Sequence, residues 1–330
     1  MNKHLKSVAC IITASIIATS AQASQVMRCS HQLPPENHIA KIIDQWAAEI
    51  ETLSENEIDV QVFNANSLVK APDNAAAVTA GDIECAFSIS SQWATSLPHM
   101  SVTLEPFAMS DIETLKKWGG SRTADELNSK LLSTGVKNIA WLFTTGRTVI
   151  TSKARNLIKP ADFLNVKIQG LEPSTDAAFM AMGAMTIPMP DKLAYQALAK
   201  GEIDAGVTDV SAAVSEKYYE VQDHATILPL FSVLFNGYVN PSWYDRLSEK
   251  SRQAIQNAGR KASVWAIEAS EISAAAAPGK LAEEGMKIHF ATESEITALR
   301  EVMVPAFVKA FSQSTGNEGI KLIQLLGESE

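Results

Sequence analysis

Histidine and cysteine do much of the metal binding and nucleophilic chemistry in proteins, so their spacing is informative. No two histidines have the HExxH spacing, and no CxxC, GxSxG, GxxxxGK[ST] or GxGxxG motif is present. The sequence therefore predicts a protein that is not an enzyme and holds no metal or other cofactor. The histidines that follow residue 23 are His31, His38, His99, His224 and His289.

Two cysteines, Cys29 and Cys85, also follow residue 23. They lie in short strand-like runs, Val26–Ser30 and Ile83–Ser88. If these runs are neighbouring strands in an oxidising compartment, a disulfide is possible. The alternative is two buried small hydrophobic residues, and the sequence leaves both open.

The first 23 residues have the pattern of a secretory signal peptide. Lys3 and Lys6 precede an apolar run from Val8 to Ala18, and Ala21-Gln22-Ala23 matches an A-x-A cleavage site. No later apolar run approaches the roughly 18–20 residues that span a bilayer. We therefore expect an exported, soluble protein in which residues 1–23 are removed.

Composition narrows the class of partner. The 330 residues include 28 Lys plus Arg against 37 Asp plus Glu, a formal net charge of −9. Nucleic acids and anionic membranes attract clustered positive charge, so neither is expected as the main partner. The length favours two domains, because single cores rarely grow beyond about 250–300 residues.

Strand-like and helix-like patterns alternate along the chain, which is typical of α/β folds with helices covering parallel strands. A capping-box pattern at 123–126 predicts a helix that ends at Gly135 and precedes a strand over 136–143. A long helix is predicted over 248–284, with a bend at Pro278, and further helices over 293–312 and 317–326. The two α/β sets comprise strands 26–30, 58–62, 83–88, 166–169, 185–187 and 203–207 and helices 39–53, 72–80, 174–182 and 191–200.

The stretch 146–213 resembles the solute-binding proteins of tripartite ATP-independent periplasmic (TRAP) transporters, the dicarboxylate-binding DctP-like family. Each short motif is weak, but their order and spacing fit the family over nearly the whole chain after residue 23. The matching pieces are Arg147 before a strand, KPADF at 159–163, VKI at 166–168, MGAMTIPM at 182–189, YQALAKGEID at 195–204, KYYEVQ at 217–222 and WYDRL at 243–247.

The resemblance implies a two-lobed α/β clamp, each lobe a mixed sheet flanked by helices, with one long helix spanning both lobes. It places lobe I at 24–144 plus about 237–272, and lobe II at 145–236 plus about 273–330. It also implies a periplasmic monomer that closes on a small-molecule solute and delivers it to TRAP permease subunits in the membrane, without ATP or chemistry on the solute.

Three positions depart from the family pattern. Gln169 stands where most members carry an arginine that pairs with a carboxylate ligand, and an amide supplies no charge. Asp209 follows Thr208 where the family has a polar asparagine segment, and Glu105 stands where an apolar residue is common. Gln169 could still bind a ligand oxygen, Asp209 could cap a helix that begins near Ser211, and Glu105 could face solvent.

The departures favour an amine or zwitterion such as ethanolamine as ligand. A small carboxylate bound through Arg147, a ligand sensor for a membrane receptor, and an exported enzyme remain alternatives. Aromatic rings can hold a cation, although packing in the core is their commoner role. The predicted ligand-binding residues are Ser90, Trp93, Glu105, Arg147, Gln169, Thr208, Asp209, Phe235 and Asn236.

Overall fold

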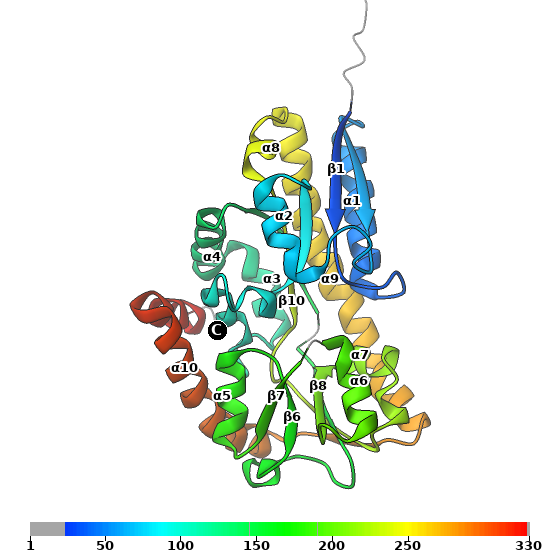
Figure 1. The fold of residues 1–330 in the computed structure, drawn as a ribbon, viewed down its shortest axis with the longest axis vertical. Coiled ribbons are helices and arrows are strands. Elements are labelled where there is room, and N and C mark those ends of the chain that lie inside the picture. The colour runs from blue at the N-terminus through cyan, green and yellow to red at the C-terminus, as the bar shows by residue number, and fades with distance from the viewer. Residues whose placement is uncertain (1–23, 145, 190, 329–330) are drawn as a thin grey trace, which may run out of the picture.

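The computed structural model describes residues 24–144, 146–189 and 191–328. Two mixed β-sheets lie one above the other, and helices cover both (Figure 1). We call the part around the five-stranded sheet lobe I and the part around the six-stranded sheet lobe II. This is the predicted two-lobed α/β architecture. The predicted signal peptide at 1–23 lies outside the described residues.

Lobe I has the strand order β2-β1-β3-β10-β4, in which β10 runs antiparallel to both of its neighbours. Helix α1 buries Ile39, Ile43, Trp46 and Ile50 on one face, as the helical spacing of these residues predicts. The strands are β1 (Gln25–Ser30), β2 (Ile58–Phe63), β3 (Cys85–Ile89), β4 (Lys137–Phe143) and β10 (Leu234–Val239). The helices are α1 (His38–Leu53), α2 (Asn74–Ala80), α3 (Ile112–Lys117), α4 (Arg122–Ser133) and α8 (Pro241–Asp245).

Lobe II has the strand order β11-β9-β5-β8-β6-β7. Strand β5 runs antiparallel to β8 and β9, whereas β6 is parallel to β7 and β8. Its strands are β5 (Thr148–Ser152), β6 (Lys167–Gly170), β7 (Met185–Pro188), β8 (Ala205–Asp209), β9 (His224–Leu228) and β11 (Lys287–Phe290). Its helices are α5 (Pro173–Ala181), α6 (Asp191–Lys200) and α7 (Val210–Ser215).

The long helix α9 (Glu249–Glu283) contacts both lobes. It packs against α1 and β4 of lobe I and against α7 and β11 of lobe II. The chain also passes between the lobes from β4 to β5 and from β9 to β10. The return from lobe II to lobe I is predicted between residues 236 and 237. In the structure the lobe I strand β10 begins three residues earlier, at Leu234.

The last helix, α10 (Glu293–Gly327), is broken at Gly316, where φ is 64° and ψ is −149°. The break agrees with the two helices predicted for this region. Before the break α10 packs against α5, and after it Glu318 lies 2.5 Å from Lys130 of α4. Figure 1 shows α10 running alongside both lobes with its end near α4.

One helix start differs from the sequence prediction. Helix α4 is capped by Ser121, whose hydroxyl accepts a hydrogen bond from the Ala124 amide, and not by Thr123. Thr123 lies inside the first turn with no exposed surface. Both residues can cap a helix. The preceding turn at Trp118–Gly120 ends at Ser121, so the Ser121 side chain is the one that reaches an unpaired backbone amide in the first turn of α4.

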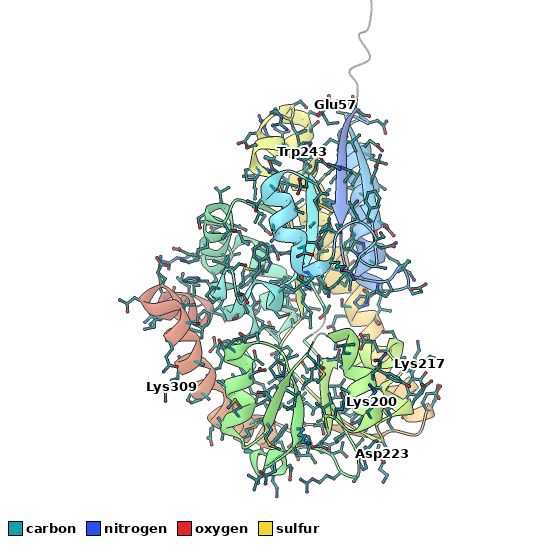
Figure 2. The ribbon with its side chains drawn as sticks, in the orientation of Figure 1. Glu57, Lys200, Lys217, Asp223, Trp243 and Lys309 are labelled. Atoms are coloured by element: carbon teal, nitrogen blue, oxygen red, sulfur yellow. A yellow bond between two sulfur atoms is a disulfide. The ribbon has the colours of Figure 1, made fainter. Side chains whose placement is uncertain are left out.

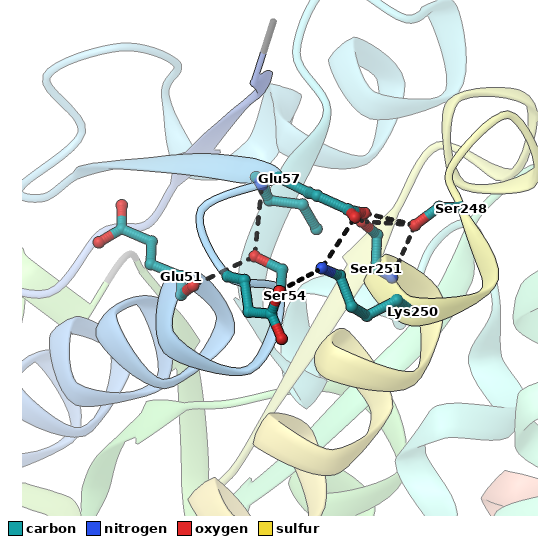
Figure 3. Close-up of polar contacts among 8 residues, drawn as sticks. Glu51, Ser54, Glu57, Ser248, Lys250 and Ser251 are labelled. Carbon is teal, nitrogen blue, oxygen red and sulfur yellow. Dashed lines mark hydrogen bonds and ion pairs between the residues drawn. The ribbon is translucent and has the colours of Figure 1, made fainter. Parts of the chain in front are cut away.

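Polar contacts tie the start of α9 to the outer end of lobe I (Figure 3). Glu57 accepts hydrogen bonds from the hydroxyls of Ser248 and Ser251, and Lys250 lies 2.9 Å from its other oxygen. These donors lower the pKa of Glu57 to about 2. Figure 2 shows Glu57 and Trp243 at this end of the molecule and Asp223 at the opposite end, in lobe II. The cluster is therefore remote from the space between the lobes.

Candidate ligand cavity between the lobes

A cavity of about 410 Å³ lies between the two lobes. It is lined from lobe I by residues that follow β1 and end β3, and from lobe II by the ends of β6 and β8. Ser273 of α9 also lines it. Carboxyl ends of strands are the usual ligand position in open α/β sheets, so this is the candidate ligand site.

Five of the nine predicted ligand-binding residues line this cavity. Ser90 and Phe235 come from lobe I, and Gln169, Thr208 and Asp209 from lobe II. They are brought together from four separate elements of the chain. That these residues touch a ligand stays a prediction.

Trp93 and Asn236 are buried beside this group without lining the cavity. The Trp93 indole donates to the Asn236 side chain at 2.8 Å, and its ring meets Tyr238 edge to face. This packing orders the ends of β3 and β10, next to Ser90 and Phe235. The structure thus gives both residues a supporting position.

Glu105 and Arg147 are also not among the lining residues. Glu105 is 9% exposed and follows Leu104, which does line the cavity. The Arg147 guanidinium lies 3.7 Å from the Glu271 carboxylate on α9, and the Arg147 backbone carbonyl accepts from the Val210 amide. Arg147 is therefore directed to α9 in this conformation.

Asp209 is both a helix cap and part of the cavity wall. Its Oδ1 accepts from the Ser211 amide at 2.7 Å, so it caps α7, as one of the two sequence readings predicts. Its Oδ2 is buried and has no hydrogen bond of good geometry from a described residue. Burial raises the pKa of Asp209 to about 6, and hydrogen bonds from the Ser211 amide, the Ser211 and Thr144 side chains and the Ala212 amide oppose this shift.

Two further carboxyl groups, Glu172 and Asp176, follow Gln169 closely in the sequence, and Gln169 itself is 1% exposed. Glu172 caps α5 by accepting from the amides of Ser174 and Thr175. Asp176 accepts from the Leu171 amide at 2.8 Å, and burial, together with the charge of Glu172, raises its pKa to about 6. Neither of these two carboxyl groups is among the residues that line the cavity.

Sequence reasoning did not predict the contribution of α1. Glu36, Asn37, His38 and Lys41 all line the cavity. Asn37 caps α1 by accepting from the Ile39 amide, and the His38 ring lies 2.9 Å from the Ser270 hydroxyl of α9. A capping residue shortly after the first strand is a signal that could have placed this helix start at the sheet edge. The lobe II residues Glu216 and Tyr218 were missed as well.

The charged lining residues are mostly acidic. Among the cavity residues that the structure describes, three are acidic, Glu36, Asp209 and Glu216, and one is a lysine, Lys41. Over residues 24–144, 146–189 and 191–328, no group of three or more His, Cys, Asp or Glu side chains is arranged to hold a metal ion. The same residues include no helix with the length and apolar character needed to cross a bilayer.

Residues 29–314 match the family model described as bacterial extracellular solute-binding protein, family 7. The chain belongs to this family. It is 27% identical over 309 residues to the 2,3-diketo-L-gulonate-binding periplasmic protein YiaO of Escherichia coli, covering 91% of this chain and 88% of that protein. It is 24% identical to the ectoine-binding periplasmic protein TeaA of Halomonas elongata, covering 98% of this chain and 94% of that protein.

Among solved structures, a TRAP periplasmic solute-binding protein from Desulfovibrio salexigens with bound orotic acid has the same fold. Its TM-score is 0.86 at 21% identity, and the match covers 93% of this chain and 98% of that one. Family membership identifies the chain as a periplasmic TRAP solute-binding protein for a small organic acid or other solute. Such proteins are transport receptors and not enzymes.

Proposed function

We propose that this protein captures a small amine or zwitterion, of the ethanolamine kind, between its lobes. The observation that carries the proposal is the buried carboxyl group of Asp209, which lines the cavity beside Gln169, the residue that replaces the family arginine. A carboxylate 4 Å from an ammonium contributes about 4 kcal/mol of attraction at an effective dielectric of 20, before desolvation is subtracted. That is enough to select the sign of the ligand charge.

Two further observations support an ammonium group. Glu216 lines the lobe II side of the cavity together with Asp209, so a dicarboxylate would approach like charges. The relative TeaA is named for ectoine, a zwitterion, whereas YiaO is named for a sugar acid. The family thus includes members named for zwitterions and members named for acids. Which kind of ligand a member binds should depend on the charged residues of its own cavity.

The test is a thermal-shift screen of amines, zwitterions and dicarboxylates, followed by calorimetry. A ligand at 100 times its dissociation constant stabilises the native state by about 2.7 kcal/mol. Asp209→Asn should weaken amine binding tenfold or more, because Asn still caps a helix but carries no charge. Gln169→Arg should abolish amine binding.

A matched control is Asp111→Asn, which alters another aspartate that caps a helix, α3, outside the cavity. It should leave affinity unchanged. Tight binding of a dicarboxylate by the wild-type protein, with no binding of any amine, would refute the proposal.

We also propose that the loaded protein acts as a monomer and delivers its solute to the TRAP permease subunits in the membrane. Light scattering gives the mass in solution, and uptake of labelled solute into cells lacking the permease tests delivery. Uptake that persists without the permease would favour a sensor role instead.

A further inference from the structure

We propose that Lys41 binds an anionic group on the ligand, so that the site selects a zwitterion over a simple amine. This inference rests on the proposed function, because it assumes an ammonium group at Asp209. Lys41 adds a second charged contact to the ligand, made by lobe I. It lies in none of the family motifs found in the sequence.

The first support is the position and pairing of Lys41. It lies in the first turn of α1 and lines the same cavity as Asp209. Among the lining residues that the structure describes, Lys41 is the only lysine or arginine. It forms no ion pair with a described carboxylate. Glu36 also lines this end of the cavity without pairing to Lys41.

The second support is that the charge of Lys41 acts at the cavity wall. His38, which lines the cavity, has a pKa lowered by burial and by the nearby Lys41 ammonium. The N-terminal end of a helix also carries partial positive charge, and α1 is 16 residues long. The lysine and the helix end therefore place positive charge on the lobe I side of the cavity, where Glu36 also lies.

A buried hydroxyl from another element of lobe I lines the same cavity. Ser90 has no exposed surface, and its Oγ has no hydrogen-bond partner among the described residues. Buried polar groups of this kind are normally satisfied, so a ligand oxygen or ammonium is the natural partner. On the lobe II side, Asp209 and Glu216 supply negative charge. A ligand with charges of both signs complements both sides.

The two sides also belong to different lobes, which bears on closure. Lys41 and Ser90 belong to lobe I, whereas Asp209 and Glu216 belong to lobe II. A zwitterion that contacts both sides stabilises the closed state by two charged contacts, and a simple amine by one. Differential contact of this kind is what shifts an equilibrium between open and closed states.

The experiment is calorimetry with two matched probes, ethanolamine and β-alanine. Both carry an ammonium on a two-carbon chain, and β-alanine has a carboxylate in place of the hydroxyl group. Wild-type protein should bind β-alanine at least tenfold more tightly. Lys41→Met should reduce β-alanine affinity to the ethanolamine level and leave ethanolamine affinity within about twofold.

Lys117→Met, which alters an exposed helical lysine of lobe I outside the cavity, is the control and should change neither affinity. The thermal midpoint of Lys41→Met should match the wild type, because the side chain is exposed. If ethanolamine binds as tightly as β-alanine, or if Lys41→Met leaves their ratio unchanged, the Lys41 assignment is wrong and the amine site at Asp209 stands. If the wild type binds neither probe but binds a dicarboxylate, both proposals fail.

Discussion

Arg147 and Glu271 form an ion pair that joins the segment crossing between the lobes to the long helix α9, with 3.7 Å between guanidinium Nη2 and carboxylate Oε2. Their side chains are 45% and 34% exposed, so the pair should contribute no more than about 1 kcal/mol to stability. In this conformation Arg147 is paired with α9 and is not among the residues that line the cavity.

We therefore expect Arg147→Lys to change solute affinity by less than threefold, measured by calorimetry with the best ligand from the screen. Glu271→Gln should have a similarly small effect, because it removes only the partner. A loss of tenfold or more in Arg147→Lys alone would identify Arg147 as a carboxylate anchor and restore that alternative.

Amine affinity should depend on pH through Asp209. Its pKa is raised to about 6, so the carboxylate that attracts an ammonium is lost as pH falls through 6. Affinity should fall about tenfold from pH 7 to pH 5, since about nine-tenths of the group is ionised at the first pH and about one-tenth at the second. Calorimetry from pH 5 to 8 measures this, and Asp209→Asn should give a flat profile. A flat wild-type profile would contradict the role of Asp209.

The same raised pKa predicts the sign of a stability change without ligand. The native pKa of Asp209 lies above its unfolded value of about 3.8, so the native state binds the proton more tightly. This group therefore lowers the free energy of unfolding as pH rises from about 4 to above 6, by up to about 3 kcal/mol. Urea titrations at pH 5 and pH 7 should therefore differ between the two proteins, with Asp209→Asn more stable relative to the wild type at pH 7 than at pH 5. Asp176 has a pKa shifted in the same direction, whereas burial lowers the pKa of His31 to about 4 and acts in the opposite direction in both proteins.

Cys29 and Cys85 occupy directly opposed positions on β1 and β3, with Cα atoms 4.3 Å apart. The predicted neighbouring strands are confirmed, and bridging in the exported protein is the prediction that follows. A link across 56 residues should stabilise the native state by about 4 kcal/mol in the chain-entropy model. Thiol titration of unfolded protein purified from periplasm should find no free thiol, and Cys29→Ala/Cys85→Ala should unfold at lower urea concentration. Two reactive thiols per chain would rule out the bridge.

Gly259 sets the close approach of α9 to β4. A Cβ there would overlap the Ile139 carbonyl oxygen, so Gly259→Ala should destabilise the protein by about 1–3 kcal/mol or more. Gly279 lies in the same helix with open space around it, so Gly279→Ala should stabilise by about 0.5–1 kcal/mol. Thermal unfolding compares the two. Equal effects in the same direction would mean that packing against β4 does not constrain α9.

Local patterns in the sequence predicted the elements whose apolar spacing is strong. Helix α1, the continuous α9 with Pro278 inside it, and the break in the last helix near Gly316 were all expected. Family likeness then placed Gln169 and Asp209 at one cavity. These features depend on residues close together in the chain or on a shared motif.

Other features depend on contacts that no local pattern encodes. The Arg147–Glu271 pair joins residues more than 100 positions apart. Lys41 has the spacing of a solvent-facing residue on an amphipathic helix, and only the meeting of the lobes brings it to a cavity. Ser121 and Thr123 are both good capping residues, and the choice between them depends on the preceding turn.

The position of β10 has a consequence for how the chain matures. In the described part of the chain β4 pairs only with β10, and β10 lies between β3 and β4 although nearly 100 residues separate it from β4 in sequence. During translocation the lobe I sheet can begin only as β2-β1-β3, and β4 has no strand partner until residues 234–239 have emerged. Five of the six lobe II strands, β5 to β9, lie in that interval, and β11 follows only after α9. We therefore expect the two lobes to finish folding together and late, after most of the chain has crossed the membrane, so that residues 24–144 expressed alone would leave β4 unpaired and prone to aggregation.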